Sequence, residues 1–530
     1  MSETTQGNNA AGKRARLLRS AASMSVITLL SRVLGLLREQ IRAHYLGTSL
    51  ASDAFGLAFQ IPNLLRRLVA EGAMSAGFIP VLSDVEEREG RAGAIRFANR
   101  YFNLVLVVLS GVTAVGMLGA STIVSLFVLI GGRAVPPEAV ELTTSLTRWM
   151  FPYIAFVSFA AVAQGVLNTY RIFWVSAASS VVMNLAIIGG AVLLVGVVDQ
   201  PVYGFAIGVL VAGVLQFAVQ VPFVFKLGFK WKPDFQVGPG VRKALWLLVP
   251  TLFGAGVYQI NVLVSQAIAW GLGSGAVSSL QYSSRLLELT LGVFAVAIST
   301  VVLPSLSREA AAGNLDEVRA TTMYAVRLSC FVCFPMAAAL FLLRAETASL
   351  LFERGAYKAS STSMTAYAMG FHLIGLVHIA LGRIFVPVFY AFKDTKTPVL
   401  VAFVAMFVNI GLCYGLAGPL GHGGIALANT GSALVQTALL AFLLGRHTGP
   451  LSDDTTGRSL LLSGLATVAA CGVVLAMTGP LLDGHAGTSL ALPYLLVLTS
   501  AVATFLATCW LLRHPELTEV VDLIRRRRRS

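Results

Sequence analysis

The stretch YFNLVLVVLSGVTAVGMLGASTIVSLFVLI, residues 101–130, contains no charged side chain. An α-helix rises 1.5 Å per residue, so about twenty residues of this kind cross a hydrocarbon core ~30 Å thick. Its apolar residues do not alternate with polar ones, as the strands of a membrane barrel require. The stretch is therefore predicted to be a transmembrane helix, and comparable stretches recur along the chain.

The composition extends this prediction to the whole chain. Hydrophobic residues make up 56% of 530 residues, charged residues make up 12%, and the mean hydropathy is +0.77. Soluble domains carry about twice that share of charge, so a soluble globular protein is excluded. The net charge of +14 does not indicate a nucleic-acid-binding protein, because the basic residues are distributed according to the membrane spans.

Fourteen helical spans are predicted, which makes the fold class an all-α polytopic membrane protein. The spans cover residues 21–46, 52–83, 101–130, 138–167, 172–197, 202–227, 241–270, 276–306, 324–343, 362–392, 397–417, 423–445, 459–480 and 490–512. Loops on the side of the N-terminus, with the span ends that border them, hold 26 Lys/Arg, whereas the opposite side holds four. Because positive residues accumulate on the cytoplasmic side, both termini are predicted to be cytoplasmic.

Two sequence matches indicate an internal repeat. Pro80-Val81-Leu82-Ser83 ends the second span, and Pro304-Ser305-Leu306-Ser307 ends the eighth, 224 residues later. Asn184 in the fifth span and Asn409 in the eleventh lie 225 residues apart. Six spans separate the copies, so both halves keep the same orientation, as in two-lobed transporters with parallel repeats. The predicted lobes are residues 21–228 and, with the linker, 229–447.

The last two spans fall outside the repeat. Residues 448–513 are predicted to add two helices to the lobes, and residues 1–20 and 514–530 are predicted to be basic cytoplasmic tails. The run Arg525–Arg529 beside a membrane indicates contact with anionic lipid headgroups, with topology anchoring as the simpler interpretation.

Ionisable residues within the predicted spans are the candidate functional residues. An arginine at the centre of a bilayer costs ~2.5–3.5 kcal/mol even on the lenient insertion scale, so each must face water, a partner or an anion. The spans contain Arg32, Arg38, Arg42, Arg66, Arg67, Glu71, Arg285, Glu288 and Arg383. At ~100° per residue, Arg32, Arg38 and Arg42 fall within about 120° of one helix face.

Spacing predicts some pairs among these charges. Arg285 with Glu288, and Arg67 with Glu71, are close enough on a helix to touch. No acid is so placed for Arg32, Arg38 or Arg66, and Asp53 can reach them only across helices. The excess positive charge predicts an anionic substrate, because guanidinium groups match phosphate oxygens and stay charged. Arg42 and Arg383 have snorkelling to an interface as the alternative interpretation.

The segments that carry these charges resemble the MurJ (MviN) flippases of the multidrug/oligosaccharidyl-lipid/polysaccharide exporter superfamily. The resemblance covers at least residues 20–450, and its first two motifs are highly specific. The matching segments are SRVLGLLRE (31–39), SDAF (52–55), IPNLLRR (61–67), AEGA (70–73), YSSRLLE (282–288), LPSLS (303–307), LFERG (351–355) and FYAFKDTKTP (389–398).

The resemblance implies a bacterial cytoplasmic-membrane protein that moves lipid II to the periplasmic leaflet for cell-wall synthesis. It implies two six-helix lobes around a cationic cavity and two further helices that form a groove for the lipid tail. By position, Arg32, Arg38, Asp53, Arg66, Arg285 and Glu288 match residues that the family needs. Arg32, Arg38, Arg66 and Arg285 are the expected substrate-binding residues, and Asp53, Glu288, Arg42 and Glu71 the expected gating or ion-pairing residues.

Other functions are weighed by residue chemistry. Some family members hold sodium with acids in the seventh and eleventh spans, but residues 250–270 and 398–418 here contain none. A multidrug exporter of the same superfamily should have an acidic cavity, whereas a flippase for another polyprenyl-pyrophosphate glycan remains open. A membrane enzyme needs acidic metal-binding clusters, and the chain has no DDxxD or HExxH motif. No cofactor or catalytic residue is therefore predicted.

Overall fold

The computed structural model describes residues 26–67, 77–451 and 454–519, and these residues are almost entirely helical. A single isolated bridge, between Val195 and Val198, is the only β-pairing in that part of the chain. The chain divides into two compact units, Met1–Leu263 and Val264–Ser530, with the boundary inside one helix. The sequence-based lobe limits at residues 228 and 447 remain predictions.

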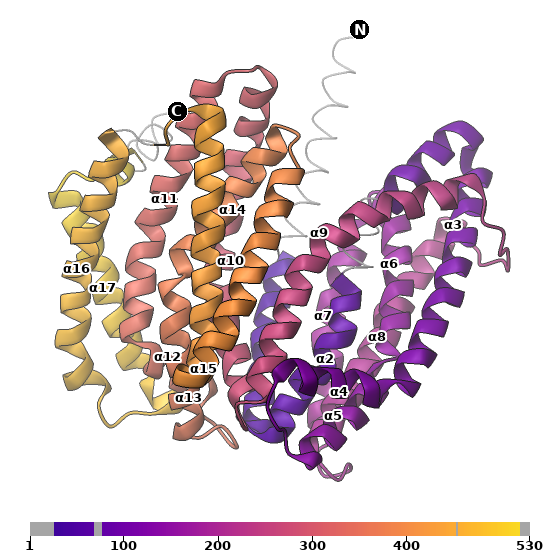
Figure 1. Cartoon of the computed structure of the whole chain (residues 1–530), viewed down its shortest axis with the longest axis horizontal. Coiled ribbons are helices and arrows are strands. Elements are labelled where there is room, and N and C mark those ends of the chain that lie inside the picture. The colour runs from indigo at the N-terminus through magenta and orange to yellow at the C-terminus, as the bar shows by residue number, and fades with distance from the viewer. Residues whose placement is uncertain (1–25, 68–76, 452–453, 520–530) are drawn as a thin grey trace, which may run out of the picture. The chain divides into compact units, whose positions relative to one another are not determined.

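The first unit begins with a helix described from residue 26 to residue 46. It continues with α2 (Leu50–Arg66), α3 (Ile79–Leu118), α4 (Ala120–Gly131), α5 (Pro137–Met150), α6 (Tyr153–Thr169), α7 (Phe173–Leu193), α8 (Pro201–Lys226) and the first part of α9 (Pro239–Trp270) (Figure 1).

The second unit contains the rest of α9 and, among the described residues, nine further named elements. These are α10 (Ala276–Ala311), α11 (Leu315–Leu342), α12 (Arg344–Phe352), α13 (Ala359–Ile374), α14 (Leu376–Ala391), α15 (Lys396–Thr448), α16 (Asp454–Leu482), the 3₁₀ turn η2 (Gly487–Leu490) and α17 (Ala491–Leu511) (Figure 1). A short helix at residues 515–519 follows.

Each of the fourteen predicted spans overlaps a described helix, although residues 21–25 and 68–76 of the first two spans lie outside the described residues, and the helices have breaks that the sequence did not predict. Among the described residues, eight helices are long and apolar enough to cross a membrane, and a bent pair, α13 with α14, makes nine. Spans rich in arginine fail that test of composition. Two long helices, α3 and α15, each reverse at a glycine with positive φ, Gly90 (φ 67°) and Gly421 (φ 57°), so each contains parts of two predicted spans.

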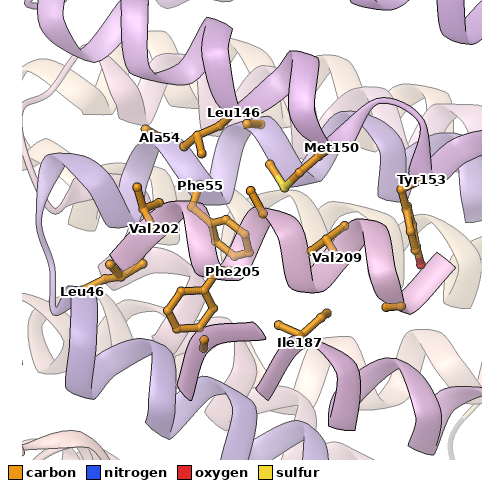
Figure 2. Close-up of a cluster of buried hydrophobic side chains, with 14 of the residues drawn as sticks. Leu46, Ala54, Phe55, Leu146, Met150, Tyr153, Ile187, Val202, Phe205 and Val209 are labelled. Atoms are coloured by element: carbon orange, nitrogen blue, oxygen red, sulfur yellow. The ribbon is translucent and has the colours of Figure 1, made fainter. Parts of the chain in front are cut away.

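The first unit has an apolar core where the first helix meets α2, α5, α6, α7 and α8. Phe55, Phe205 and Met150 lie at its centre (Figure 2). Two of these helices, α7 and α8, approach closely because Gly190 faces Gly208: a Cβ at Gly190 would lie 2.6 Å from the Gly208 Cα. Small residues allow such close backbone packing in membrane helices. This core holds the first helix, which carries three of the candidate arginines.

A buried asparagine in each unit donates a hydrogen bond to another helix. Asn184 of α7 donates its side-chain amide to the carbonyl of Ser31 in the first helix at 3.2 Å. Asn409 of α15 donates to Ser265 Oγ of α9 at 2.8 Å. In the numbering of the repeat, each bond joins the fifth span of a half to its first span. The donors are 225 residues apart and the acceptors 234, so the contacts join the same pair of spans in each half but not the same positions along the first span.

The last two helices pack against the second unit through an apolar cluster and polar contacts at both ends. Leu343, Val474, Val497 and Phe505 belong to the cluster. At one end of α17, the Tyr494 hydroxyl lies 2.8 Å from Thr347 Oγ1. Beyond its other end, Glu516 accepts from Arg327 Nε of α11 at 2.9 Å. Helices α16 and α17 therefore form one body with α11 and α12.

Candidate functional site

The first helix carries Arg32 at its centre, and that side chain is half-buried. Among the residues that the structure describes, Arg32 makes no hydrogen bond and no ion pair. Its place is nevertheless fixed, because Asn184 binds the carbonyl of the preceding residue, Ser31. A half-buried guanidinium with no partner in the described part of the chain is suited to bind an anion.

Two other arginines of the first helix share one carboxylate. Arg38 Nη2 lies 2.6 Å from Glu39 Oε1, and Arg42 Nη1 lies 3.6 Å from Glu39 Oε2. The expectation that no nearby acid serves Arg38 is wrong, since its neighbour in sequence provides one. The side chain of Arg38 is still 15% exposed, and one carboxylate cannot neutralise two guanidinium groups.

Arg42 has a structural role inside the first unit and does not extend to the membrane interface. Its side chain is 7% exposed, so it does not snorkel. Its Nη2 donates to the Ser52 carbonyl at 2.9 Å, and its guanidinium lies 5.4 Å from the centre of the Phe55 ring. Asp53, 1% exposed, lies in the first turn of α2, where the helix dipole favours a negative charge. Arg42 therefore joins the first helix to the start of α2.

The other end of α2 brings Arg66 into the same unit. Arg66 is half-buried, and its Nε donates to Asn63 Oδ1 at 3.0 Å. The Asn63 side chain is a neutral amide, so this contact does not neutralise the charge of Arg66. The predicted partner of Arg67, Glu71, lies outside the described residues, so the pairing of these two residues stays a prediction.

The second unit carries Arg285 and Glu288 on α10. Arg285 Nη1 lies 3.2 Å from Glu288 Oε2, so the pair predicted from the three-residue spacing is present. The side chains are 31% and 49% exposed, which makes this pair accessible to solvent. Arg383 of α14 is exposed. His372 is buried and lies 2.7 Å from Ser283 Oγ, which indicates a packing role.

The charges of the first unit do not balance. The described first helix and α2 contain five arginines, with Arg67, against two acids, Glu39 and Asp53. An isolated charge in a membrane is unfavourable, so this excess is expected to be matched by an anion. No group of three or more residues able to hold a metal ion occurs among the described residues. The arrangement suits binding of a phosphate group.

Sequence reasoning missed Glu39. Its spacing to Arg42, three residues along a helix, is the signal that could have found it. Sequence reasoning identified Asn184 and Asn409 only as marks of the repeat. Their role in holding the first helix of each half depends on contacts over more than a hundred residues, which no local pattern reports.

Comparison with known proteins decides the family. A family model described as lipid II flippase MurJ matches residues 42–495. The chain belongs to the MurJ family. A MurJ of Burkholderia cenocepacia, named a lipid II flippase, is 37% identical over 465 residues, which are 85% of this chain and 89% of that protein. A probable lipid II flippase MurJ of Vibrio cholerae is also 37% identical, over 80% of this chain and 82% of its own length.

Solved structures confirm the fold. A lipid II flippase MurJ in an inward closed conformation matches with a TM-score of 0.79 and 25% identity, covering 94% of this chain and 99% of that one. An inward-facing MATE transporter of the MOP superfamily matches with a TM-score of 0.68 and 17% identity over 81% of this chain, which shows a common fold alone. This MurJ-family chain is therefore an all-helical, multi-pass membrane transporter and not an enzyme.

Proposed function

We propose that this chain moves lipid II, the polyprenyl-pyrophosphate precursor of the cell wall, from the cytoplasmic to the periplasmic leaflet. The observation that carries the proposal is Arg32: a half-buried guanidinium, within a predicted membrane span, that has no partner among the described residues. Charge-assisted, bidentate hydrogen bonds make arginine the preferred residue for phosphate. Membership of the MurJ family supplies the class of lipid.

Arg38, Arg66 and Arg285 are proposed to bind the pyrophosphate with Arg32. Arg38 contacts Glu39, Arg66 contacts Asn63 and Arg285 contacts Glu288, and each arginine side chain stays partly exposed. Such contacts orient a guanidinium without using all five of its N–H donors. Arg285 and Glu288 are proposed to separate and re-form during the switch between states, whereas Asp53 and Arg42 hold the first helix to α2.

Alternating access supplies the movement in this proposal. The two halves of the repeat are proposed to rock, with the states a few kcal/mol apart so that the bound headgroup can shift their populations. The prenyl tail is proposed to stay in lipid along α16 and α17. Both termini are proposed to be cytoplasmic, where the run Arg525–Arg529 would bind anionic headgroups.

A depletion experiment tests the proposal. The native flippase of a bacterial host is depleted, this chain is expressed, and the lipid II accessible from outside the cell is measured. Wild type is expected to restore accessible lipid II, whereas Arg32→Ala and Arg38→Ala at equal expression are expected to restore little. Restoration by the alanine variants would contradict the role of the arginines. Export of a cationic dye, or flipping of another polyprenyl-pyrophosphate glycan in place of lipid II, would contradict the proposed substrate.

A further inference from the structure

The linker between α8 and α9, residues 227–238, contains no regular helix but is held to α3 along its length. Asn99 accepts from the Lys232 amide at 2.9 Å and donates to the Lys230 carbonyl at 3.1 Å. Asn103 donates to the carbonyls of Lys232 at 2.7 Å and Asp234 at 3.0 Å. Four hydrogen bonds to backbone groups therefore give this linker a defined conformation.

Side-chain contacts add to this attachment. Arg100 binds Asp234 Oδ2 at 2.7 Å and Gln236 Oε1 at 2.8 Å. The hydrogen bond from Arg100 lowers the pKa of Asp234 below its ordinary value, so this carboxylate stays ionised and paired. Phe229 is buried in the cluster that also contains Val241 of α9. The linker is thus fixed at its start, middle and end.

The fixed linker turns large apolar side chains and lysines outward. Trp231 is 54% exposed, Phe235 58% and Val237 50%. The Trp231 ring is held by its indole N–H, which donates to Asn103 Oδ1 at 2.8 Å. The lysines at 226, 230 and 232 are exposed as well. Because Asp234 is paired with Arg100, these lysines leave the surface positively charged.

The place of the linker in the chain identifies what covers this surface. It follows α8, an apolar helix long enough to span a membrane, and leads into α9, so it lies where helices leave the bilayer. The exposed apolar side chains continue into both helices, at Phe225 (50%) and Trp246 (72%). Tryptophan with lysine is typical of the membrane interface, where the ring lies among headgroups and the ammonium binds lipid phosphate.

We propose that Trp231, Phe235, Val237 and the lysines at 226, 230 and 232 form a binding surface for anionic phospholipid, presented by the contacts of Asn99, Arg100 and Asn103. The exposed apolar side chains of the linker are continuous with those of α8 and α9, as binding to lipid requires and binding to a protein partner does not. Each lysine close to an anionic surface is expected to raise lipid binding about fivefold. The inference concerns bulk membrane lipid and does not depend on the transported substrate.

Tryptophan quenching by brominated lipid tests this surface. The full chain is reconstituted in nanodiscs that contain equal fractions of brominated phosphatidylglycerol or brominated phosphatidylcholine, and the Trp231 signal is the difference from W231F. Stronger quenching by the anionic lipid is expected. In the triple variant K226Q/K230Q/K232Q, the preference for the anionic lipid over the zwitterionic lipid is expected to fall at least fivefold. The signal of the buried Trp270, obtained as the difference from W270F, is the control. It is expected to show no preference between the two lipids.

Two results would overturn the proposal. Equal quenching of Trp231 by both lipids, or an unchanged preference in the triple variant, would remove the anionic headgroup as the ligand. Absence of quenching by either lipid would mean that the rings face water or a protein. Variant R133Q/K358Q removes two basic residues from the loops on the other predicted side and is expected to keep the preference. Lipid II accessibility, measured on the same variants, separates a failure here from a failure of the proposed function.

Discussion

At the scale of single residues, the contacts of the arginines in the first helix indicate different roles. Arg42 is buried against Ser52, Phe55 and Glu39, whereas Arg32 has no partner among the described residues. A buried charge with satisfied contacts stabilises a fold, and its loss leaves other groups unpaired. An accessible charge without partners has little effect on stability and is available for a ligand.

Substitution of these two arginines should therefore separate folding from transport. Arg32→Ala is expected to abolish most flipping and to leave the free energy of unfolding within about 0.5 kcal/mol of wild type. Arg42→Ala is expected to destabilise by about 3 kcal/mol, because Glu39 and the Ser52 carbonyl lose a buried partner. Thermal unfolding in detergent and external lipid II measure the two effects. The exposed Arg383→Ala is the control, and equal destabilisation by Arg32→Ala would contradict the distinction.

A second residue-scale prediction concerns Glu516, which is buried beyond the last span. Burial alone raises its pKa, but hydrogen bonds from His514 and Ser459 outweigh that effect and hold the pKa below its ordinary value. A carboxyl with a lowered pKa in the folded state contributes stability above its unfolded pKa, and loses it as pH falls through the folded pKa.

Glu516→Gln is accordingly expected to lower the free energy of unfolding at pH 7 by about 3 kcal/mol, since Arg327 is left without its carboxylate. The difference from wild type should shrink as pH falls below about 4. Unfolding midpoints across this pH range measure it. Glu87→Gln, at an exposed position of α3, should show neither effect. A difference that grows towards low pH would contradict the assignment.

At the scale of elements, Asn184 connects packing to the candidate site. Its amide joins α7 to the Ser31 carbonyl, one residue before Arg32. Hydrogen bonds between membrane helices contribute about 0.6 kcal/mol on average, so Asn184→Ala is expected to change stability little. It should reduce flipping several-fold, because the first helix loses the contact that places Arg32. Asn409→Ala, which removes the equivalent bond to Ser265, is the matched comparison. Unchanged flipping in Asn184→Ala would contradict this role.

Apolar length and the distribution of basic residues are enough to predict where helices cross the membrane. They do not predict breaks within a span, such as Phe151–Pro152 between α5 and α6 or the 47° bend between α13 and α14. Pro152 and Gly375 lie at these two breaks, but proline and glycine also occur inside unbroken helices of this chain, such as Pro222 in α8, so the residue type alone does not locate a break.

The sequence predicts the contacts of the candidate site only in part as well. Spacing predicts the pair of Arg285 and Glu288 on one helix. Adjacent residues on a helix point about 100° apart, so the contact of Arg38 with Glu39 was not expected. It depends on how both side chains are turned inside the folded unit. The bond of Asn184 to Ser31 lies beyond local patterns for a different reason, because packing of α7 against the first helix has to form before the two residues meet.

At the scale of the whole molecule, orientation in the membrane decides which leaflet each surface meets. The loops on the predicted cytoplasmic side, with the adjoining span ends, hold 26 Lys/Arg against four on the other side. Positive residues are retained in the cytoplasm, where the anionic lipids of the inner leaflet also lie. The linker at Lys230 and the segment at Lys358 should therefore face opposite sides of the membrane.

Cysteine labelling of intact cells tests this orientation. The native cysteines at 330, 333, 413 and 509 are buried and Cys471 is half-buried, so the parent chain should give a low background. Lys358→Cys is expected to react with a membrane-impermeant maleimide from outside, because position 358 is exposed. Lys230→Cys, also exposed, should react only after the cells are permeabilised. Labelling of Lys230→Cys in intact cells would reverse the orientation, and would place the linker surface and Arg525–Arg529 away from the anionic leaflet that they are proposed to bind.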